Sequence, residues 1–484
     1  MRLFEISEEA KKEGLNNTEI TGVTDNTKEF EPGNIFVCIK GANFDGHTAA
    51  KEMLEKGAAA VITERDLGLE NQLIVPNSRK YFAKLASAYH RNPAKKLRLI
   101  AVTGTNGKST VIALIKHILE KQGYKVGSIG TVNYDTAGKT YEAHLTVPRQ
   151  FELYRLLRET AENGADYCVV EASSQALAQD RFADELFDCA VFTNLTQDHL
   201  DWHKTMENYY LAKRSLFDMT KSAVVCIDGK YGEKLVKYIK AEHNMPLITY
   251  SAKDFADNYA VNIKAAGIGN SYWLSSAKEE KSFPVKLALP GLFNVANSIA
   301  AVGACTSVGV KLDDAVGALS DFKGVRGRSE VIYNGDFTVI CDYAHTEDAL
   351  IKFLSSIRSI ADSAFQGSRL ICVFGAPGER DKAKRPLMGE AAARHADYII
   401  VTSDNPRFEA EDEIIEQVCK GIKSTPYETF TDRKEAIEAA MKIAEKGDVI
   451  ALCGKGHETY QVIGDKYLPF DEREIVLNAI KELL

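Results

Sequence analysis

A glycine-rich segment near residue 105 separates a predicted strand from a predicted helix. The apolar run at residues 97–102 predicts a buried strand, and residues 111–121 repeat apolar side chains with the period of a helix. The residues expected to form the loop between them are Gly104, Thr105, Asn106, Gly107, Lys108, Ser109 and Thr110. A strand, a tight glycine loop and a helix in this order are typical of parallel α/β sheets.

The same loop is expected to bind phosphate. Glycines let backbone N–H groups approach phosphate oxygens, and the N-terminus of a helix adds positive potential. The loop is shorter than the usual G-x-x-x-x-G-K-[ST] pattern, but its position between a strand and a helix is the one that a P-loop requires. We therefore expect a nucleoside triphosphate here, with Lys108 at the β- and γ-phosphates and the Ser109 hydroxyl on Mg²⁺.

Two further side chains are expected near that magnesium ion, because Mg²⁺ takes more oxygen ligands than one hydroxyl. Glu171 ends one predicted strand and His199 follows another, so both are expected at strand ends that face the loop. Taken alone, His199 is more typical of a loop histidine bonded to its neighbours. Its placement together with Glu171 favours metal ligation.

Short apolar runs alternate with amphipathic helical stretches through most of the 484 residues, so the fold class is expected to be α/β. A chain of this length is too long for a single core. The pattern changes near Asn92-Pro93 and again at residues 323–327. These changes predict three domains, at residues 1–92, 93–325 and 326–484.

The last of these domains contains four apolar runs that each end in a polar cluster. The clusters lie at residues 342–345, 375–381, 403–407 and 454–458. Because ligands of open α/β sheets bind beyond the carboxyl ends of the strands, the four clusters predict one composite binding site. The alternative is that they are ordinary surface loops, which are polar by default.

Composition excludes several classes of protein. The chain has 60 Lys and Arg against 68 Asp and Glu, and its net charge of −8 argues against a general nucleic-acid or anionic-membrane binder. Nine cysteines without a CxxC pair indicate a reducing compartment and no zinc ribbon. No signal peptide is visible, and no apolar run approaches the roughly 20 residues of a membrane span. We expect a soluble cytoplasmic enzyme that acts on small molecules.

The ordered set of motifs resembles the Mur ligases, the ATP-dependent amide-forming enzymes of peptidoglycan precursor synthesis. The matching segments lie at residues 104–110, 171–174, 192–203, 291–297, 342–345, 380–386, 404–407 and 454–458. The resemblance implies an N-terminal domain for the UDP end of the substrate, a central P-loop ATPase-like parallel sheet, and a C-terminal Rossmann-like domain for the incoming amino acid. It also implies ATP and Mg²⁺ as cofactors, a monomer, and an acyl-phosphate intermediate that the amine attacks.

The resemblance also implies roles for residues at matching positions. The catalytic positions are those of Lys108, Glu171, His199 and Lys213, the last matching a lysine that is carbamylated in the family and helps to hold Mg²⁺. Without the resemblance, Lys213 would be interpreted as a solvated helix lysine. The implied nucleotide contacts beyond the loop are Asn297, Arg328 and, at the ribose, Asp342. The implied contacts of the UDP-muramoyl dipeptide are Asn26, Thr146, Val147, Ser173, Gln179 and Arg181.

One motif bears on the amino acid that is added. The residues that look like the motif of members adding meso-2,6-diaminopimelate are Asp404, Asn405, Pro406 and Arg407. Because this amino acid carries a carboxylate and an ammonium at its far end, Arg380 and Arg407 are expected to bind the carboxylate. Glu458 is expected to pair with the ammonium, assisted by the Gly454 carbonyl.

Two alternatives stay open at this point. L-lysine or another diamino acid is the first, because residues 375–379 differ from the more common family sequence and Arg407 would then only face solvent. The second is a nucleotide-binding relative without ligase activity. It is motivated by substrate-side positions, among them Asn26, Val147 and Gln175, that depart from the family pattern.

Overall fold

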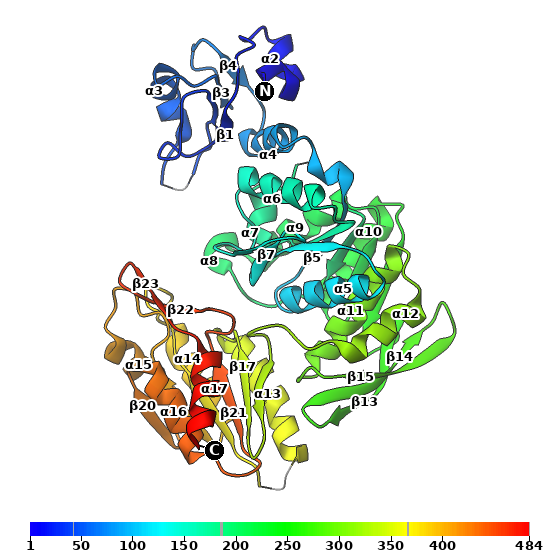
Figure 1. Ribbon diagram of the computed structural model, residues 1–484, viewed down its shortest axis with the longest axis vertical. Helices are drawn as coiled ribbons and strands as arrows, with labels where there is room; N and C mark the ends of the chain where they lie inside the picture. The colour runs from blue at the N-terminus through cyan, green and yellow to red at the C-terminus, as the bar shows by residue number, and fades with distance from the viewer. Residues whose placement is uncertain (42, 184–186, 365–366, 484) are drawn as a thin grey trace. The chain divides into compact units, whose positions relative to one another are not determined.

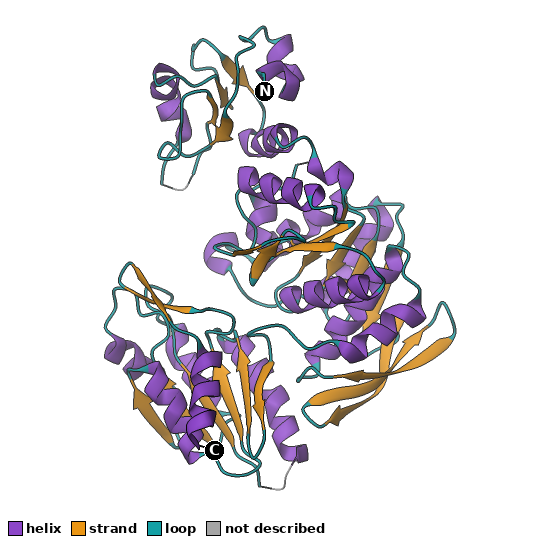
Figure 2. Ribbon diagram, viewed as in Figure 1, coloured by secondary structure: helices purple, strands orange, loops and turns teal. Residues whose placement is uncertain are grey.

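The computed structural model of the protein describes residues 1–41, 43–183, 187–364 and 367–483. The chain divides into two compact units (Figure 1). The first comprises Met1–Asn258 and Ala300–Ala315, and the second comprises Tyr259–Ile299 and Val316–Leu484. In each unit helices pack against sheets, which confirms the predicted α/β class (Figure 2). The boundaries of the three predicted domains stay a prediction.

The first unit begins with a four-stranded parallel sheet whose strands follow chain order. Its strands are β1 (Gly22–Thr24), β2 (Asn34–Val37), β3 (Ala60–Thr63) and β4 (Gln72–Ile74). The helices around it are α1 (Leu3–Ile6), α2 (Glu8–Lys12), α3 (Ala50–Glu55) and α4 (Ser78–Tyr89), with a 3₁₀ turn η1 (Gly46–Ala49). Successive residues of β2 face opposite sides, so that Ile35 packs with side chains of α4 and Phe36 with those of α3.

A larger sheet in the same unit carries the glycine-rich loop. Its strand order is β12-β11-β10-β5-β9-β6-β7-β8. The strands from β12 to β6 are parallel, and β7 and β8 extend the edge in antiparallel fashion. The strands are β5 (Arg98–Thr103), β6 (Val126–Ile129), β7 (Asn133–Asp135), β8 (Thr140–Glu142), β9 (Tyr167–Glu171), β10 (Cys189–Phe192), β11 (Ala223–Cys226) and β12 (Leu247–Ser251).

Helices cover both faces of this sheet, which explains why its strands are almost continuously apolar. The helices are α5 (Lys108–Lys121), α6 (Gln150–Glu162), α7 (Ser174–Ala178), α8 (Leu200–His203), α9 (Met206–Arg214) and α10 (Lys230–Glu242), with 3₁₀ turns η2 (Pro93–Lys96) and η3 (Ser215–Met219). Side chains of α6, α7 and α10 form one core with Leu99 and Ala101 of β5. Helix α5 packs on the opposite face, so the predicted strand and helix on either side of the loop are confirmed.

The second unit starts with the neighbouring strands β13 (Asn258–Ala266), β14 (Gly269–Ser276) and β15 (Lys281–Leu287), of which β14 and β15 pair antiparallel. The next elements are α11 (Phe293–Ser307) and α12 (Leu312–Gly317), both of which cross between the units, and the 3₁₀ turn η4 (Ala318–Asp321). A six-stranded sheet follows, with the order β16-β17-β21-β18-β19-β20. Only its edge strand β16 is antiparallel to its neighbour.

The six-stranded sheet has the layered arrangement expected of a Rossmann-like domain. Its strands are β16 (Glu330–Asn334), β17 (Thr338–Asp342), β18 (Leu370–Phe374), β19 (Tyr398–Thr402), β20 (Tyr427–Phe430) and β21 (Val449–Cys453), and a hairpin is formed by β22 (Tyr460–Ile463) and β23 (Lys466–Pro469). The helices are α13 (Glu347–Ala364), α14 (Lys384–Ala393), α15 (Glu411–Cys419), α16 (Arg433–Ile443) and α17 (Glu472–Leu483). Cys372 of β18 packs toward α13–α15, whereas Ile371 packs toward α16 and α17.

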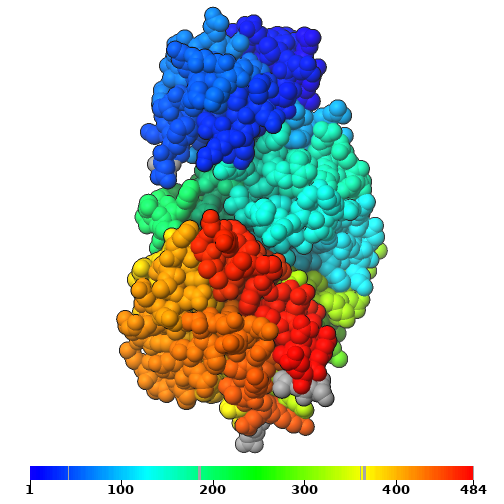
Figure 3. Space-filling view, turned by 60° about the vertical axis from the view of Figure 1, so that its left-hand side comes forward, coloured from blue at the N-terminus to red at the C-terminus, as the bar shows by residue number. Residues whose placement is uncertain are grey.

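Helix α17 lies beside α16, and Figure 3 shows this C-terminal segment in red on the surface of the unit. Of the helices that the structure describes, none combines the length and the apolar character needed to cross a bilayer.

Candidate functional site

The glycine-rich loop has a backbone that only glycine accommodates at its first position. It leaves β5 at Thr103 and enters α5 at Lys108. Gly104 has φ 148°, and a Cβ on it would lie 1.9 Å from Thr193 Oγ1. Gly107, the N-cap of α5, has φ 88° in the left-handed region. Helix α5 begins at Lys108, and the N-terminus of a helix favours an anion.

Hydrogen bonds join the loop to the segment that follows β10. Asn106 N donates to Asn194 Oδ1 at 3.0 Å, and Asn194 Nδ2 donates back to the Asn106 carbonyl at 3.1 Å. Among the described residues, nothing accepts a hydrogen bond from the buried Asn106 Nδ2. This amide is therefore a donor that a ligand oxygen could satisfy.

Two lysines converge on the loop backbone. Lys108 Nζ donates to the carbonyl oxygens of Thr105 at 2.9 Å and Gly104 at 3.2 Å. Lys213, on α9, donates to the same Gly104 carbonyl at 2.7 Å. Lys213 is only 1% exposed, so its interpretation as a solvated helix lysine is wrong. Burial, together with the charge of Lys108, lowers the pKa of the Lys213 amine well below its usual range.

Glu171 lies buried at the end of β9, where the β6–β7 connection holds its carboxylate. Thr131 N donates to Oε1 at 3.1 Å and Thr131 Oγ1 donates to Oε2 at 3.0 Å. The Thr131 hydroxyl also lies 3.1 Å from Thr146 Oγ1, which links a predicted substrate residue to this carboxylate. A Cβ on Gly130 would lie 2.7 Å from Glu171 Oε1, so the carboxylate would have to shift to accommodate a larger residue there.

His199 is the N-cap of α8 and has φ 53°, a conformation that few non-glycine residues adopt. Its Nε2 lies 3.5 Å from Asp198 Oδ2. Burial lowers the pKa of His199, Asp198 opposes the shift, and the charges of Lys108 and Lys213 add to it. The positive charges of Lys108 and Lys213 therefore act on the imidazole.

The structure thus brings the four predicted catalytic residues around one loop, with Ser109 and Thr110 in the first turn of α5. The side chains that the structure describes include no group of three His, Cys, Asp or Glu residues placed to hold a metal ion by themselves. A cation here would need other oxygen ligands as well.

Two stacked aromatic side chains, one of which contacts the loop and Lys213, were not among the residues predicted from the sequence. Tyr209 is buried, its OH lies 3.2 Å from Thr105 Oγ1, and its ring lies 4.7 Å below Lys213 Nζ. His203 stacks on the same ring at 5.0 Å and its Nε2 lies 2.9 Å from Ser174 Oγ. Tyr209 and Lys213 are four residues apart on α9, so the helical period could have identified Tyr209 once Lys213 was singled out.

Three of the residues predicted for the UDP-linked substrate contact one another in the first unit. Arg181 donates to Gln179 Oε1 from NH2 at 3.0 Å and to the Val147 carbonyl from NH1. The Val147 side chain is buried in the core, so only its backbone is available here. The Ser173 hydroxyl caps α7 by accepting from Ala176 N at 3.2 Å.

Asn26 lies in the loop after β1, where its Oδ1 accepts from Lys28 N at 3.0 Å. The neighbouring Asp25 lies 3.9 Å from Arg149, which precedes α6. Burial raises the pKa of Asp25, although Arg149 opposes the shift. The loop after β1 and the start of α6 therefore carry facing charges.

In the second unit, the predicted nucleotide residues Arg328 and Asp342 lie together. Ser329 N donates to Asp342 Oδ2 at 2.7 Å, and burial raises the pKa of this carboxyl against the opposing charge of Arg328. The Arg328 guanidinium stacks 4.6 Å from the centre of the Tyr343 ring. Asn297, on α11, instead donates to Asn294 Oδ1 at 2.8 Å.

The loops after β18 and β19 pack backbone against backbone. Gly378 N donates to the Asn405 carbonyl at 2.9 Å, and a Cβ on Gly378 would lie 1.8 Å from the Pro406 carbonyl oxygen. Arg407 has φ 53° and its NH1 donates to the Gly378 carbonyl at 3.1 Å. The guanidinium of Arg407 is therefore anchored, whereas Arg380 is exposed.

Side chains from three of the polar clusters contact the Glu458 carboxylate. Tyr343 OH lies 3.3 Å from Oε1, and Asn405 Nδ2 donates to Oε2 at 3.0 Å. Lys455 Nζ donates to Oε2 at 3.2 Å. This lysine was not among the residues predicted from the sequence. Gly454 has φ 111°, and a Cβ on it would lie 2.8 Å from an oxygen of Asp404. The four clusters meet, as the sequence predicted.

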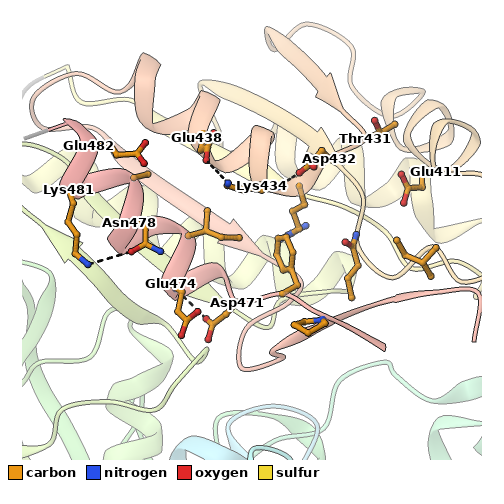
Figure 4. A pocket seen from close by; sticks show the side chains of 17 residues that line it. Glu411, Thr431, Asp432, Lys434, Glu438, Asp471, Glu474, Asn478, Lys481 and Glu482 are labelled. Carbon is orange, nitrogen blue, oxygen red and sulfur yellow. Dashed lines mark hydrogen bonds and ion pairs between the residues drawn. The ribbon is translucent and has the colours of Figure 1, made fainter. Parts of the chain in front are cut away.

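A separate cavity of about 850 Å³ lies between α16, α17 and the β22–β23 hairpin (Figure 4). Its lining is rich in charged side chains, and Lys434 pairs with Glu438 at 3.6 Å within it. None of the residues predicted for the site lines this cavity. The candidate site is therefore the set of loops described above rather than this cavity.

Family models of Mur ligases match this chain, and so do relatives that are named as ligases. Three family models match, the one described as "Mur ligase family, catalytic domain" at residues 19–94, "Mur ligase middle domain" at 102–305 and "Mur ligase, glutamate ligase domain" at 327–456. The chain is 42% identical, over 100% of both chains, to a UDP-N-acetylmuramoyl-L-alanyl-D-glutamate--2,6-diaminopimelate ligase 1 of Clostridium acetobutylicum. A ligase of the same name from Caldanaerobacter subterraneus is also 42% identical, over 100% of this chain and 99% of the relative. A solved structure with that ligase name is 33% identical with a TM-score of 0.69, covering 96% of this chain and 95% of its own.

Proposed function

Because the chain belongs to the Mur ligase family, we propose that it is the ATP-dependent ligase that adds meso-2,6-diaminopimelate to UDP-N-acetylmuramoyl-L-alanyl-D-glutamate. The observation that carries the choice of amino acid is the anchored guanidinium of Arg407, three residues after Asp404 in a loop that also contacts Glu458. The far end of diaminopimelate is a zwitterion, and this loop region supplies both signs of charge.

The chemistry must make a carboxylate, which is a poor electrophile, reactive toward an amine. ATP transfers its γ-phosphoryl group to a carboxylate oxygen of the substrate, which gives an acyl phosphate and ADP. The amine attacks the acyl carbon, inorganic phosphate leaves with the electron pair of the broken C–O bond, and the amine nitrogen loses a proton. The protein contributes by positioning the reactants and neutralising charge.

The glycine-rich loop is the proposed triphosphate site. Lys108 and the N–H groups at the start of α5 bind the β- and γ-phosphates, and the unpartnered Asn106 amide supplies a further donor. The oxygen ligands proposed for Mg²⁺ are the Ser109 hydroxyl, the Glu171 carboxylate, phosphate oxygens and water, a set that suits a hard cation. Mg²⁺ would offset the negative charge that develops during phosphoryl transfer.

We propose that Lys213 is carbamylated. Burial favours the neutral amine, and the neutral amine is the form that attacks CO₂ to give a carbamate and a proton. The carbamate would supply anionic oxygens beside the loop. The lowered pKa of His199 likewise favours the neutral imidazole, which is the form that binds a metal ion.

The other assignments are part of the same proposal. Asn297 and Arg328 bind the adenine side of the nucleotide and Asp342 binds the ribose. The UDP-muramoyl dipeptide is bound by Asn26, Thr146, Val147, Ser173, Gln179 and Arg181. The chain works as a cytoplasmic monomer with the domain division given above, and its nine unpaired cysteines fit a reducing compartment.

The test is an amino-acid panel in a ligase assay. The protein is incubated with ATP, Mg²⁺, UDP-N-acetylmuramoyl-L-alanyl-D-glutamate and one diamino acid, and phosphate release is followed. We expect release with meso-diaminopimelate and at least a hundredfold lower kcat/KM with L-lysine. Release with L-lysine but not with diaminopimelate would reject the substrate assignment, and ATP binding with no amino-acid-dependent release would reject the ligase.

A further inference from the structure

Lys455 is a fully buried lysine in the loop that follows β21. Its side chain contacts the loop that follows β19. Its Nζ donates to Asn405 Oδ1 at 2.6 Å, to the Tyr460 carbonyl at 2.7 Å and to Glu458 Oε2 at 3.2 Å. Asp404 Oδ1 lies 3.7 Å away. These partners offset the cost of removing an ammonium from water, and most of them belong to the loops proposed to bind the diamino acid.

We propose that Lys455 is a positioning residue that sets the charge of the diamino-acid pocket and so its preference for a zwitterionic over a cationic far end. This inference rests on the proposed function and deepens it. Lys455 acts through Glu458 and Asn405 and need not touch the substrate itself.

The charges of the pocket lead to this role. Asp404 and Glu458 are two carboxylates, and the ammonium of Lys455 lies within 4 Å of both. Lys455 therefore offsets part of the negative charge that faces the far ammonium of the substrate, while Arg407 supplies a positive charge for the far carboxylate. Without Lys455 the pocket would carry one more negative charge, and a far end with an ammonium alone would be favoured.

Lys455 also decides which oxygen of Glu458 is presented. Oε2 is occupied by Lys455 and by Asn405 Nδ2, whereas Oε1 has the single contact with Tyr343 OH at 3.3 Å in the contacts of the described residues. Oε1 thus has more acceptor capacity for a substrate ammonium. Loss of Lys455 would leave Asn405 Nδ2 as the remaining donor to Oε2 among the residues that the structure describes, so the carboxylate would be held less firmly.

The competing interpretation is that Lys455 only stabilises the local structure. Its bond to the Tyr460 carbonyl ties the loop after β21 to the start of the β22–β23 hairpin. Loss of a purely structural residue would weaken the binding of every amino acid alike. Loss of a charge-setting residue would instead change the affinities for diaminopimelate and L-lysine in opposite directions. The two roles are therefore separable by measuring both amino acids.

The experiment compares K455M, K455R and the matched control K466M, which changes an exposed lysine of the same hairpin. The KM for meso-diaminopimelate and the inhibition constant of L-lysine against it are measured with phosphate release, and the KM for ATP is the internal control. For K455M we expect a KM for diaminopimelate at least tenfold higher, an inhibition constant of L-lysine that is equal or lower, and an unchanged KM for ATP. K455R retains the charge and should keep the ratio of the two constants within about threefold of the parent, and K466M should change nothing.

An inhibition constant that rises in proportion to the KM would overturn the charge-setting role, as would an unchanged KM. If K455M is insoluble, K455Q is measured in its place. If neither variant folds, Lys455 is a structural residue and the inference is rejected. An inactive parent protein would instead reject the proposed function, so the two failures are distinguishable.

Discussion

Lys213 Nζ donates a 2.7 Å hydrogen bond to the carbonyl oxygen of Gly104, a residue 109 positions earlier in the chain. The contact places a buried amine against the backbone of the glycine-rich loop, within the field of Lys108. A lysine in such surroundings is costly to the fold, because its ammonium loses water and faces a like charge. This cost is consistent with the carbamylation that we propose for Lys213.

Replacement of Gly104 by alanine should abolish nucleotide binding. The new Cβ would collide with Thr193 Oγ1 and would be strained at φ 148°, so the loop must move. We expect the affinity for ADP to fall at least fiftyfold, as measured by isothermal titration calorimetry. Gly317→Ala is the matched control, since its Cβ meets no atom within 4 Å and its backbone is helical. An affinity within threefold of the parent for Gly104→Ala would contradict the proposed role of the loop.

Lys213→Met should remove activity and keep the fold. We expect kcat to fall at least a hundredfold, because the methionine cannot form a carbamate, while the melting temperature stays within a few degrees. The control is Lys237→Met, at an exposed position on α10, which should leave both quantities unchanged.

The same variant should also change how stability depends on pH. Because the pKa of Lys213 is lower in the folded chain, the unfolded chain binds the extra proton between that pKa and the usual lysine value. The free energy of unfolding therefore gains a contribution that rises with pH in this window, and Lys213→Met should lose it. Urea denaturation at several pH values in CO₂-free buffer, where Lys213 carries the free amine, measures the difference, and identical pH profiles would show that the amine is not shifted.

Arg407→Ala should weaken binding of diaminopimelate selectively. The variant loses the guanidinium that Gly378 anchors, and a charge-assisted pair of this kind contributes about 1.5–3 kcal/mol. We expect the KM for diaminopimelate to rise at least tenfold with the KM for ATP unchanged. Arg394→Ala, which removes an exposed arginine paired with Glu390 on α14, is the control. Unchanged kinetics with diaminopimelate would mean that Arg407 does not bind the far carboxylate.

Arg433→Met should destabilise the second unit. The Arg433 guanidinium is fully buried, and it donates to Glu472 at 2.8 Å, to the Ser403 carbonyl at 3.1 Å and to the Cys453 carbonyl at 2.7 Å. Removing one partner of a buried pair leaves an uncompensated charge, which costs about 3–5 kcal/mol. Urea denaturation should show this loss, and the double change with Glu472→Met should recover part of it.

A control for that experiment is Arg158→Ala on α6. Arg158 pairs with Glu162 at the surface, and exposed pairs of this kind contribute less than about 1 kcal/mol. A loss for Arg433→Met as small as that of Arg158→Ala would contradict the importance of the buried pair.

Residues near one another in the chain were predictable where a backbone rule applied. The strand, glycine-rich loop and helix were predicted because glycine spacing, the preceding apolar run and the following helix act within about twenty residues. The meeting of the four polar clusters in the second unit was predicted because parallel strands end at the same edge of a sheet. The interpretation of Lys213 from helix position alone was wrong, since nothing in residues 206–214 reveals that the amine contacts the Gly104 carbonyl.

The chain by itself therefore determined the α/β class, the strand and helix that frame residues 104–110, and the loops that carry polar side chains. Only the tertiary structure decided which side chains are buried and what they contact, as for Lys455 with Asn405, fifty positions apart. Backbone preferences are local and depend on a few neighbouring residues. Desolvation and hydrogen-bond partners instead depend on segments that folding brings together from distant parts of the chain, and these set the charge state and the role of a buried group.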